Sequence, residues 1–232
     1  MDTSHVISKL SYYFNKYGLF HTVFSFIGRY NQEFWNLIGF SVTSPYINKW
    51  KTQISVDKRI LNLGGGSNCL SGCLTVDIDP RADAYVDITE KLPFDDCSIN
   101  AIFCEEAIEH VDLKCGLQLL RECYRILKPG GVIRLTTPDL NYFASKISES
   151  VSACSEINEV FYSHGHRYLY TREALQFHCQ EVGFTNLKMS FYQDCESKLG
   201  YLDSHANRFN HIPEITQYLE AEKSNYNQRI NI

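Results

Sequence analysis

The chain has 232 residues, of which 44% are hydrophobic and 21% charged, as expected for one globular domain with an extension. Its net charge of -5 argues against a general nucleic-acid-binding protein, which would carry a basic surface. Nine cysteines without C-x-x-C spacing predict reduced thiols that pack as small apolar residues in a cytoplasmic protein. Met1 to Lys9 is too polar for a signal peptide, and we expect no stable membrane insertion.

Residues 1–57 differ from the rest because they are dense in aromatic side chains, as in "SYYFNKYGLFHTVFSFIGRYNQEFW". Glycines punctuate this stretch, so we expect two or three short helices. Three interpretations stay open: a helical layer over the core, a lid over the substrate, and a contact with a membrane surface.

From residue 58 onward, strand and helix patterns alternate, which predicts a largely parallel sheet. The first half contains four predicted strands, at 59–63, 73–79, 84–88 and 100–106. The clearest helix follows Asp112, a suitable N-cap residue. Its predicted apolar stripe consists of Leu113, Leu117, Leu120, Tyr124 and Leu127.

"KPGG" at 128–131 is expected to end this helix before a fifth strand, "VIRLTT". A further helix is predicted at 171–182 and ends at Gly183. Two late strands, at 184–193 and 214–223, are expected to form an antiparallel hairpin. Residues 58–232 are thus predicted to form an α/β, Rossmann-like, doubly wound sheet in a three-layer αβα sandwich, mostly parallel with this C-terminal hairpin.

The glycines Gly64 to Gly66 follow the first strand, at a position where open parallel sheets bind ligands. A dinucleotide site would need G-x-G-x-x-G opening a helix, and the following "SNCLSGC" leaves no room for one. Asp77 and Asp87 end the next two strands, where carboxylates can accept hydrogen bonds from ribose hydroxyls and an exocyclic amine. This combination favours a nucleoside without phosphate, such as S-adenosylmethionine.

The stretch from about residue 58 to 140 resembles class I S-adenosylmethionine-dependent methyltransferases of the type 11 kind. The runs that carry the resemblance are "ILNLGGGSN", "VDIDP", "LPFDDCSINAIFCEEAIEHV" and "RILKPGGVIRL". The match is to a subgroup of predicted methyltransferases with a shortened first helix, and "GHRYLYTREALQFHCQEVGF" resembles its later region.

The resemblance implies a cofactor site for S-adenosylmethionine. By position, Gly64, Gly65 and Gly66 would line its methionine part, and Asp77 would bind the ribose. Asp87 and Ile88 would frame the adenine, and Cys104 and Glu105 would lie beside the sulfonium. Ile78 would also belong to the cofactor site. Asn62 stands where the family often has an acid, and its carbonyl can still accept a hydrogen bond from an ammonium group.

Methyl transfer needs alignment, exclusion of water and sometimes a base. His110, just after the fourth strand, and His164 and His166, in "SHGHRYLY", are the candidate catalytic residues. His164 and His166 alternate as metal ligands can, but no carboxylate or third ligand is evident nearby, so no metal is expected. Capping or packing is the alternative role for each histidine.

The leading hypothesis is therefore an S-adenosylmethionine-dependent methyltransferase acting on a small-molecule, sugar or lipid-linked acceptor, with O-methylation favoured over N-methylation. The alternative is a catalytically inactive S-adenosylmethionine-binding or scaffold protein of the same fold, because Asn62, Asn68 and Asn100 depart from the family pattern. A nicotinamide-dependent reductase is disfavoured because the sequence lacks the G-x-G-x-x-G motif that such an enzyme needs. A nucleic-acid methyltransferase fits poorly with the acidic balance, and fold alone does not decide the substrate.

Overall fold

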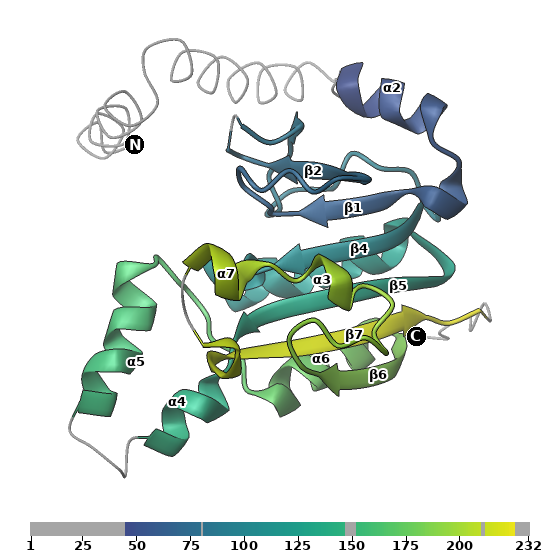
Figure 1. Ribbon diagram of the computed structural model, residues 1–232. Helices are drawn as coiled ribbons and strands as arrows, with labels where there is room; N and C mark the ends of the chain where they lie inside the picture. Colours follow the sequence, from purple (N-terminus) through teal and green to yellow (C-terminus); the bar gives the residue numbers. More distant parts are fainter. Residues whose placement is uncertain (1–44, 80, 147–151, 210–211, 226–232) are drawn as a thin grey trace, which may run out of the picture.

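A seven-stranded sheet in the order β3-β2-β1-β4-β5-β7-β6 forms the centre of the computed structural model (Figure 1). The structure describes residues 45–79, 81–146, 152–209 and 212–225, so the aromatic stretch before residue 45 lies outside the described residues. The first five strands are parallel, whereas β7 is antiparallel to both β5 and β6. The predicted α/β class with an antiparallel C-terminal pair is therefore confirmed.

The strands lie close to their predicted positions. They are β1 (Ile60–Leu63), β2 (Cys73–Asp77), β3 (Ala84–Tyr85), β4 (Ile99–Glu105), β5 (Leu127–Pro138), β6 (Phe184–Ser190) and β7 (Thr216–Lys223). One prediction for β5 is wrong, because "KPGG" lies inside this strand instead of before it. Ile99 pairs with Leu127 and Ala101 with Val132, so the intervening residues form an irregularity, with Gly130 at φ +73°.

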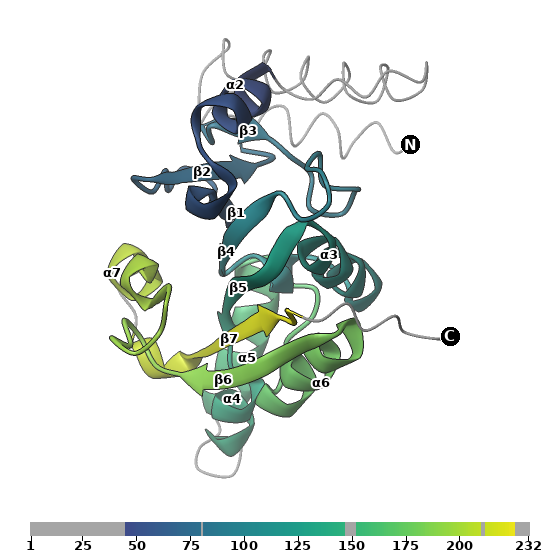
Figure 2. The ribbon, with the colours of Figure 1, turned by 90° about the vertical axis from the view of Figure 1, so that its right-hand side faces the viewer.

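Helices α3 (Leu113–Ile126) and α6 (Arg172–Val182) cover one face of the sheet, which we call the back face (Figure 2). As predicted, Asp112 caps α3 by accepting a hydrogen bond from the Cys115 N–H, and Gly183 ends α6 in the left-handed conformation. The predicted stripe of α3 is partly wrong: the buried residues are Gly116, Leu119, Leu120, Cys123 and Ile126. Gly116 belongs to the buried side because the Tyr170 hydroxyl packs against it.

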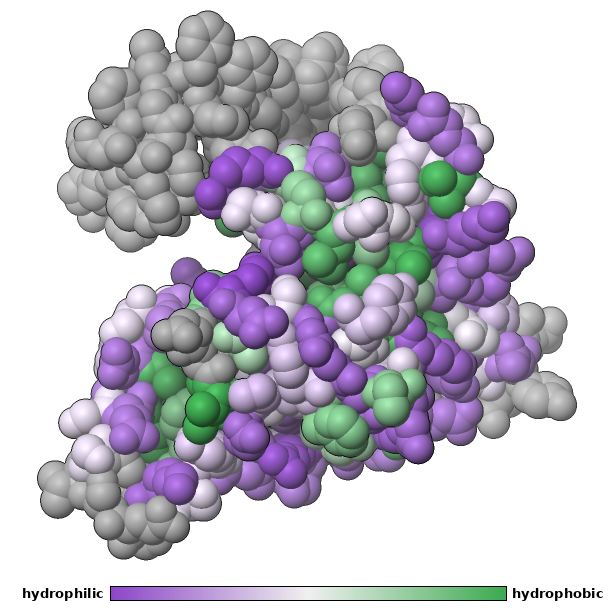
Figure 3. All heavy atoms as spheres, in the orientation of Figure 1, coloured by the Kyte–Doolittle hydropathy of each residue, from purple (hydrophilic) through white to green (hydrophobic). Residues whose placement is uncertain are grey.

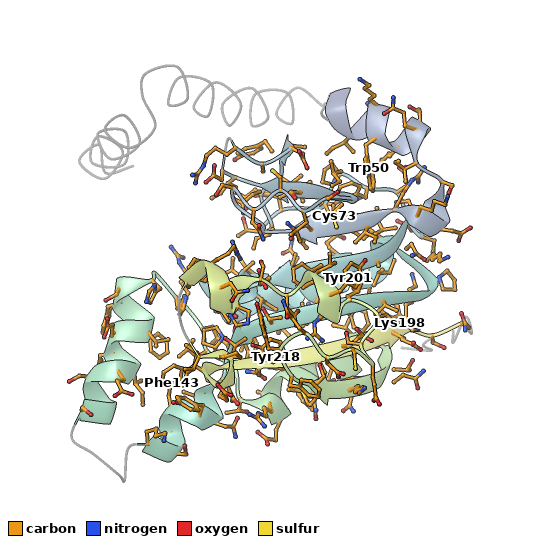
Figure 4. The ribbon with its side chains drawn as sticks, viewed as in Figure 1. Trp50, Cys73, Phe143, Lys198, Tyr201 and Tyr218 are labelled. Atoms are coloured by element: carbon orange, nitrogen blue, oxygen red, sulfur yellow. The ribbon has the colours of Figure 1, made fainter. Side chains whose placement is uncertain are left out.

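The opposite, front face is covered by the described parts of the connection between β6 and β7, residues 191–209 and 212–215 (Figure 2). This β6–β7 connection contains η3 (Gly200–Leu202), α7 (His205–Phe209) and η4 (Pro213–Ile215). Leu199 and Leu202 pack against apolar side chains of β4 and β5, namely Ala101, Phe103 and Val132. Tyr201 reaches the neighbourhood of Cys73 in β2 (Figure 4). A C-terminal segment thus occupies the face that a helix following β1 would otherwise cover.

A buried arginine fastens this connection to the sheet. Arg134, in the middle of β5, donates from Nε and Nη2 to the two carboxylate oxygens of Asp203 at 2.7 and 2.6 Å. It also donates to the hydroxyls of Ser190 and Ser197 and to the Phe191 carbonyl. Every side of the guanidinium is therefore paired, as a fully buried charge requires.

The remaining helices lie at the ends of the sheet. Helix α2 (Pro45–Gln53) places Ile47 and Trp50 against the main core, η1 (Val56–Lys58) leads into β1, and η2 (Ile108–His110) follows β4. Two helices that the sequence analysis did not predict, α4 (Leu140–Lys146) and α5 (Ser152–Ser163), precede the "SHGHRYLY" loop. None of the helices in the described ranges combines the length and apolarity that a membrane crossing needs.

Candidate functional site

The carboxyl ends of β1, β2 and β4 meet at one edge of the sheet, on the left in Figure 1. Strand order reverses between β1 and β4, and ligands of open α/β sheets bind outside such a switch point. Hydrophilic side chains gather at this edge in Figure 3. The predicted cofactor residues lie at or just after the ends of these strands and of β3, and therefore at the same edge.

The glycine loop turns sharply after β1. Gly64 (φ +73°) donates its N–H to the Val76 carbonyl at 2.9 Å, and a Cβ on Gly64 would lie 2.5 Å from the Cβ of Ala107. Gly66 (φ +57°) has nothing within 4 Å of where its Cβ would lie. The loop is thus pressed against the β4 side at Gly64 and open at Gly66, where a ligand can approach the backbone.

Asp77 binds the glycine loop from the end of β2. Its Oδ2 accepts a hydrogen bond from the Gly66 N–H at 2.8 Å, and its Oδ1 accepts one from the Asp79 N–H at 2.8 Å. Burial raises the pKa of Asp77, although both backbone hydrogen bonds oppose that shift. Each oxygen keeps a further lone pair, so the carboxylate can still accept hydrogen bonds from a diol.

Asn62 lies beneath the same loop and is buried. Its Nδ2 donates to the Asn68 carbonyl at 2.8 Å and to the Thr75 hydroxyl at 3.1 Å, which fixes the orientation of the amide. Its Oδ1 is buried without a hydrogen-bond partner. Because an unpaired buried acceptor is costly, this oxygen is a ready acceptor for a ligand's ammonium group.

The predicted adenine residues lie on the neighbouring strands. Ile78, directly after β2, keeps 49% of its surface exposed, as an apolar platform for a ring would. Ile88 packs against the main core instead. Asp87 accepts hydrogen bonds at Oδ1 from the Thr89 N–H and hydroxyl, so its carboxylate stabilises the turn after β3. The predicted contacts of these residues with the adenine remain predictions.

The two residues predicted to lie beside the sulfonium face different surroundings. The Cys104 side chain is buried in the main core, so only its backbone can face a ligand. Glu105 is buried too, and its carboxylate accepts hydrogen bonds from the Ser204 N–H and hydroxyl and the His205 N–H. Arg208 donates to it at 2.7 Å. Glu105 therefore holds α7 at the edge of the site.

Two further carboxylates lie just after β4. Glu106 has a φ of +50°, a conformation that costs energy outside glycine, and accepts hydrogen bonds from the hydroxyls of Thr136 and Thr216 at 3.3 Å. Glu109 has no exposed surface, and its Oε2 accepts a hydrogen bond from the Thr137 hydroxyl at 3.0 Å. The sequence analysis assigned neither residue a role, although "EEAIE" places three acids within five positions.

The structure brings the three predicted histidines together, because the "SHGHRYLY" loop folds back onto η2. The N–H groups of Arg167 and Tyr168 donate to the Glu109 carbonyl, which docks this loop. The ring centroids of His110 and His166 are 4.8 Å apart, and those of His164 and His166 are 5.7 Å apart. Burial lowers the pKa of His110 and lowers that of His166 to about 4.

Two comparisons with known sequences find methyltransferases. Residues 71–135 match the model of a methyltransferase domain family. Over 60 residues, the chain is 37% identical to a probable S-adenosylmethionine-dependent methyltransferase of Mycolicibacterium smegmatis, covering 26% of this chain and 23% of that protein. The matched stretch is thus about a quarter of that relative. Residues 71–135 thus match a methyltransferase domain, and the chain resembles S-adenosylmethionine-dependent methyltransferases there.

Solved structures show the same fold. An S-adenosylmethionine-dependent methyltransferase of Archaeoglobus fulgidus superposes with a TM-score of 0.51 at 17% identity, covering 76% of this chain and 91% of that one. A methyltransferase of Haloferax volcanii, solved with the Trm112 methyltransferase activator, gives a TM-score of 0.50 at 15% identity. That likeness covers 79% of this chain and 91% of the other. The fold of this methyltransferase domain is therefore the predicted one.

The cofactor of this family is S-adenosylmethionine, and the residues present fit it. The buried Oδ1 of Asn62 lacks a donor, which an ammonium group would supply. At Gly66 nothing lies within 4 Å of where a Cβ would be, so the loop backbone is open to a ligand there. Asp77, hydrogen-bonded to the Gly66 N–H, offers acceptors for ribose hydroxyls. Each of the three parts is complementary to a different part of that molecule.

Proposed function

We propose that this methyltransferase domain transfers the methyl group of S-adenosylmethionine to a hydroxyl of a small-molecule, sugar or lipid-linked acceptor. The observation that carries the proposal is the buried, unpartnered Oδ1 of Asn62 beneath the open glycine loop. A pyrophosphate-bearing dinucleotide would bring negative oxygens toward that acceptor, so the site favours a ligand with a donor there.

When bound, S-adenosylmethionine supplies a methyl group on a positively charged sulfur. Different residues of this chain would bind different parts of the cofactor. Asn62 and the Gly64–Gly66 loop would bind the amino acid end, and Asp77 would bind the ribose. Ile78 would pack against a face of the adenine. The side chain of Asp87 would accept from the adenine amine. Alignment of an acceptor atom with the methyl group can account for much of the acceleration, up to about 7–11 kcal/mol.

The histidines beside the site support a hydroxyl acceptor. A hydroxyl must lose its proton as its oxygen bonds to the methyl carbon, so a nearby proton acceptor speeds the reaction, typically about 10²–10⁴-fold. An unprotonated amine attacks through its lone pair and needs no such group. We propose that His110, His164 and His166 position the acceptor hydroxyl, and that His164 takes up its proton.

We also propose a cytoplasmic location, because all nine cysteines are free thiols. The decisive experiment is a thermal-shift comparison of S-adenosylmethionine, S-adenosylhomocysteine, NAD and NADP on the full chain. A ligand at 100 times its Kd stabilises the fold by roughly 2.7 kcal/mol. Stabilisation by the first two compounds alone supports the proposal, and stabilisation by NAD or NADP alone refutes it.

A turnover assay on hydroxylated and amine acceptors then tests the second half of the proposal. Binding of S-adenosylmethionine without turnover on any acceptor would favour a non-catalytic binding protein. Transfer to amines but not to hydroxyls would overturn the choice of acceptor atom while leaving the cofactor assignment intact.

A further inference from the structure

A buried carboxylate and two histidines converge beside the cofactor loop, at the carboxyl end of β4. Glu109, His110 and His166 each offer a ligand atom, and these atoms all lie within 4.8 Å of one another. The Nε2 of His166 is 3.9 Å from the Oε1 of Glu109, which is too long for a hydrogen bond. The two side chains therefore face each other without a direct hydrogen bond.

The atoms at this gap lack other partners. Oε1 of Glu109 is buried without a hydrogen-bond partner, and Glu109 has no exposed surface. The other ring nitrogen of His166, Nδ1, is also buried without a partner, so the His166 ring has an unpaired nitrogen too. Leaving a carboxylate oxygen unpaired in the interior is expensive unless a cation or a donor compensates it. A zinc ion lies about 2.0–2.2 Å from carboxylate oxygens and about 2.0–2.1 Å from imidazole nitrogens, so it spans a gap of this width.

The surroundings of the three side chains also fit a metal site. Oε2 of Glu109 accepts a hydrogen bond from the Thr137 hydroxyl, and the His110 side chain is hydrogen-bonded to the Gly165 backbone. Metal-ligating carboxylates and histidines are held by such partners, which fix the orientation of the ring and of the carboxylate. His110 is the most exposed of the three residues, which leaves a path from the cluster to solvent.

We propose that Glu109, His110 and His166 bind a divalent transition-metal ion. Two imidazoles and one carboxylate suit zinc, iron(II) or a similar ion, and they leave at least one coordination position open. No carboxylate lies near His166 in the sequence, which is why no metal is expected from the sequence alone; the fold supplies the carboxylate of Glu109, 57 positions earlier in the chain.

The site lies next to the proposed cofactor position. The His110 N–H donates to the Ala107 carbonyl, and Ala107 is the residue that packs against Gly64. An ion there would hold an acceptor through an oxygen atom, which narrows the acceptor class to molecules with a metal-binding hydroxyl or carboxylate. This consequence rests on the proposed methyl transfer, whereas the binding of the metal does not.

The test uses the full chain after chelator treatment, titrated with Zn²⁺ by calorimetry and with Co²⁺ by absorption spectroscopy, with Mg²⁺ as a third arm. We expect one equivalent of Zn²⁺ or Co²⁺, no comparable Mg²⁺ binding, and no thiolate-to-cobalt charge-transfer band. Glu109→Gln and His166→Gln should lose this binding. Thr137→Val should weaken it by roughly 10–100-fold. His178→Gln, a histidine in α6 outside the cluster, should match the unmodified protein.

Three outcomes overturn the proposal: no binding at one equivalent, equal binding in the ligand variants, and a thiolate band that assigns the ion to cysteines. A water bridging Glu109 and His166 would give the first of these. If circular dichroism shows that Glu109→Gln is unfolded, His166→Gln and Thr137→Val carry the test.

Calorimetry with S-adenosylmethionine on the same samples separates the two proposals. Metal binding without S-adenosylmethionine binding would refute the proposed function alone. The reverse result would refute only the metal site.

Discussion

Arg134 and Asp203 form a two-bonded ion pair in which neither side chain is exposed, although 69 positions separate them in sequence. Removing one member leaves the other charge buried and unpaired, which costs about 3–5 kcal/mol. This pair thus fastens the β6–β7 connection to the middle of the sheet.

We accordingly predict that Arg134→Met lowers the free energy of unfolding by about 3–5 kcal/mol, measured by urea denaturation. The matched control is Asp95→Asn, which removes the exposed partner of Lys51 and should cost at most about 1 kcal/mol. Similar losses in the two variants would show that the buried pair contributes little.

Asp77→Asn should weaken S-adenosylmethionine binding by about 10–100-fold in calorimetry, because hydrogen bonds to a charged acceptor are worth about 1.5–3 kcal/mol. Asp79→Asn is the matched control, since this acid lies two positions on and pairs with Arg81. If the two variants bind the cofactor equally well, Asp77 does not contact the ribose.

Gly66→Ala and Gly72→Ala form a second matched pair. Both glycines have positive φ, +57° and +82°, and both have open space where a Cβ would lie. Each alanine should therefore cost about 1–2 kcal/mol of stability through backbone strain. Only Gly66→Ala should also reduce S-adenosylmethionine affinity, and equal affinity in both variants would remove the loop from the cofactor site.

Glu105→Gln should loosen α7, because four donors from residues 204–208 converge on this carboxylate. Hydrogen exchange of the Ser204 and His205 amides should quicken by about tenfold or more. Glu220→Gln is the comparison, since Glu220 accepts from the N–H groups of Lys198 and Leu199 and should loosen those amides instead. Unchanged exchange at 204–205 would contradict the anchoring role.

Arg125→Met should destabilise the fold in a pH-dependent way. Arg125 binds Glu122 and Asp96, and its hydrogen bonds hold the pKa of both acids below their ordinary values of 4.5 and 3.8. Stability from a lowered carboxyl pKa is present above the unfolded value and is lost as pH falls through the folded one. The destabilisation should thus be largest near neutrality and shrink below about pH 4.

Urea denaturation across pH 3–7 measures this change. Arg121→Met, an exposed arginine one turn earlier in α3, is the control and should show little loss at any pH. A loss for Arg125→Met that stays constant across that range would mean that the Leu92 and Phe94 carbonyls, which also bind Arg125, dominate its contribution.

Local patterns were sufficient to predict the sheet and its main helices. The N-cap at Asp112 and the stop at Gly183 depend on backbone geometry that a few neighbouring residues determine. The candidate cofactor residues could be predicted in the same way, because Gly64 and Asp77 each lie at the end of a strand with a clear apolar pattern. Glu109 could not be found in this way, since its partner His166 lies on a loop docked by contacts distant in sequence.

The position of the β6–β7 connection on the front face could not be predicted from local sequence patterns either. The described residues of the β6–β7 connection, 191–209 and 212–215, form only short helices and turns, and nothing in their composition shows which sheet face they cover. Arg134 was the available signal, because a charged residue in an otherwise apolar strand must find a partner. Its partner, however, could lie anywhere in the chain.

Because the β6–β7 connection lies late in the chain, the sheet face that it covers is synthesised first and stays exposed until the connection follows. Ala101, Phe103 and Val132 leave the ribosome long before Leu199 and Leu202, which bury them. A nascent chain that ends near residue 190 would therefore expose an aggregation-prone apolar surface, and Arg134 would lack its partner Asp203. Premature termination or C-terminal clipping of this protein should yield aggregates rather than a smaller working domain.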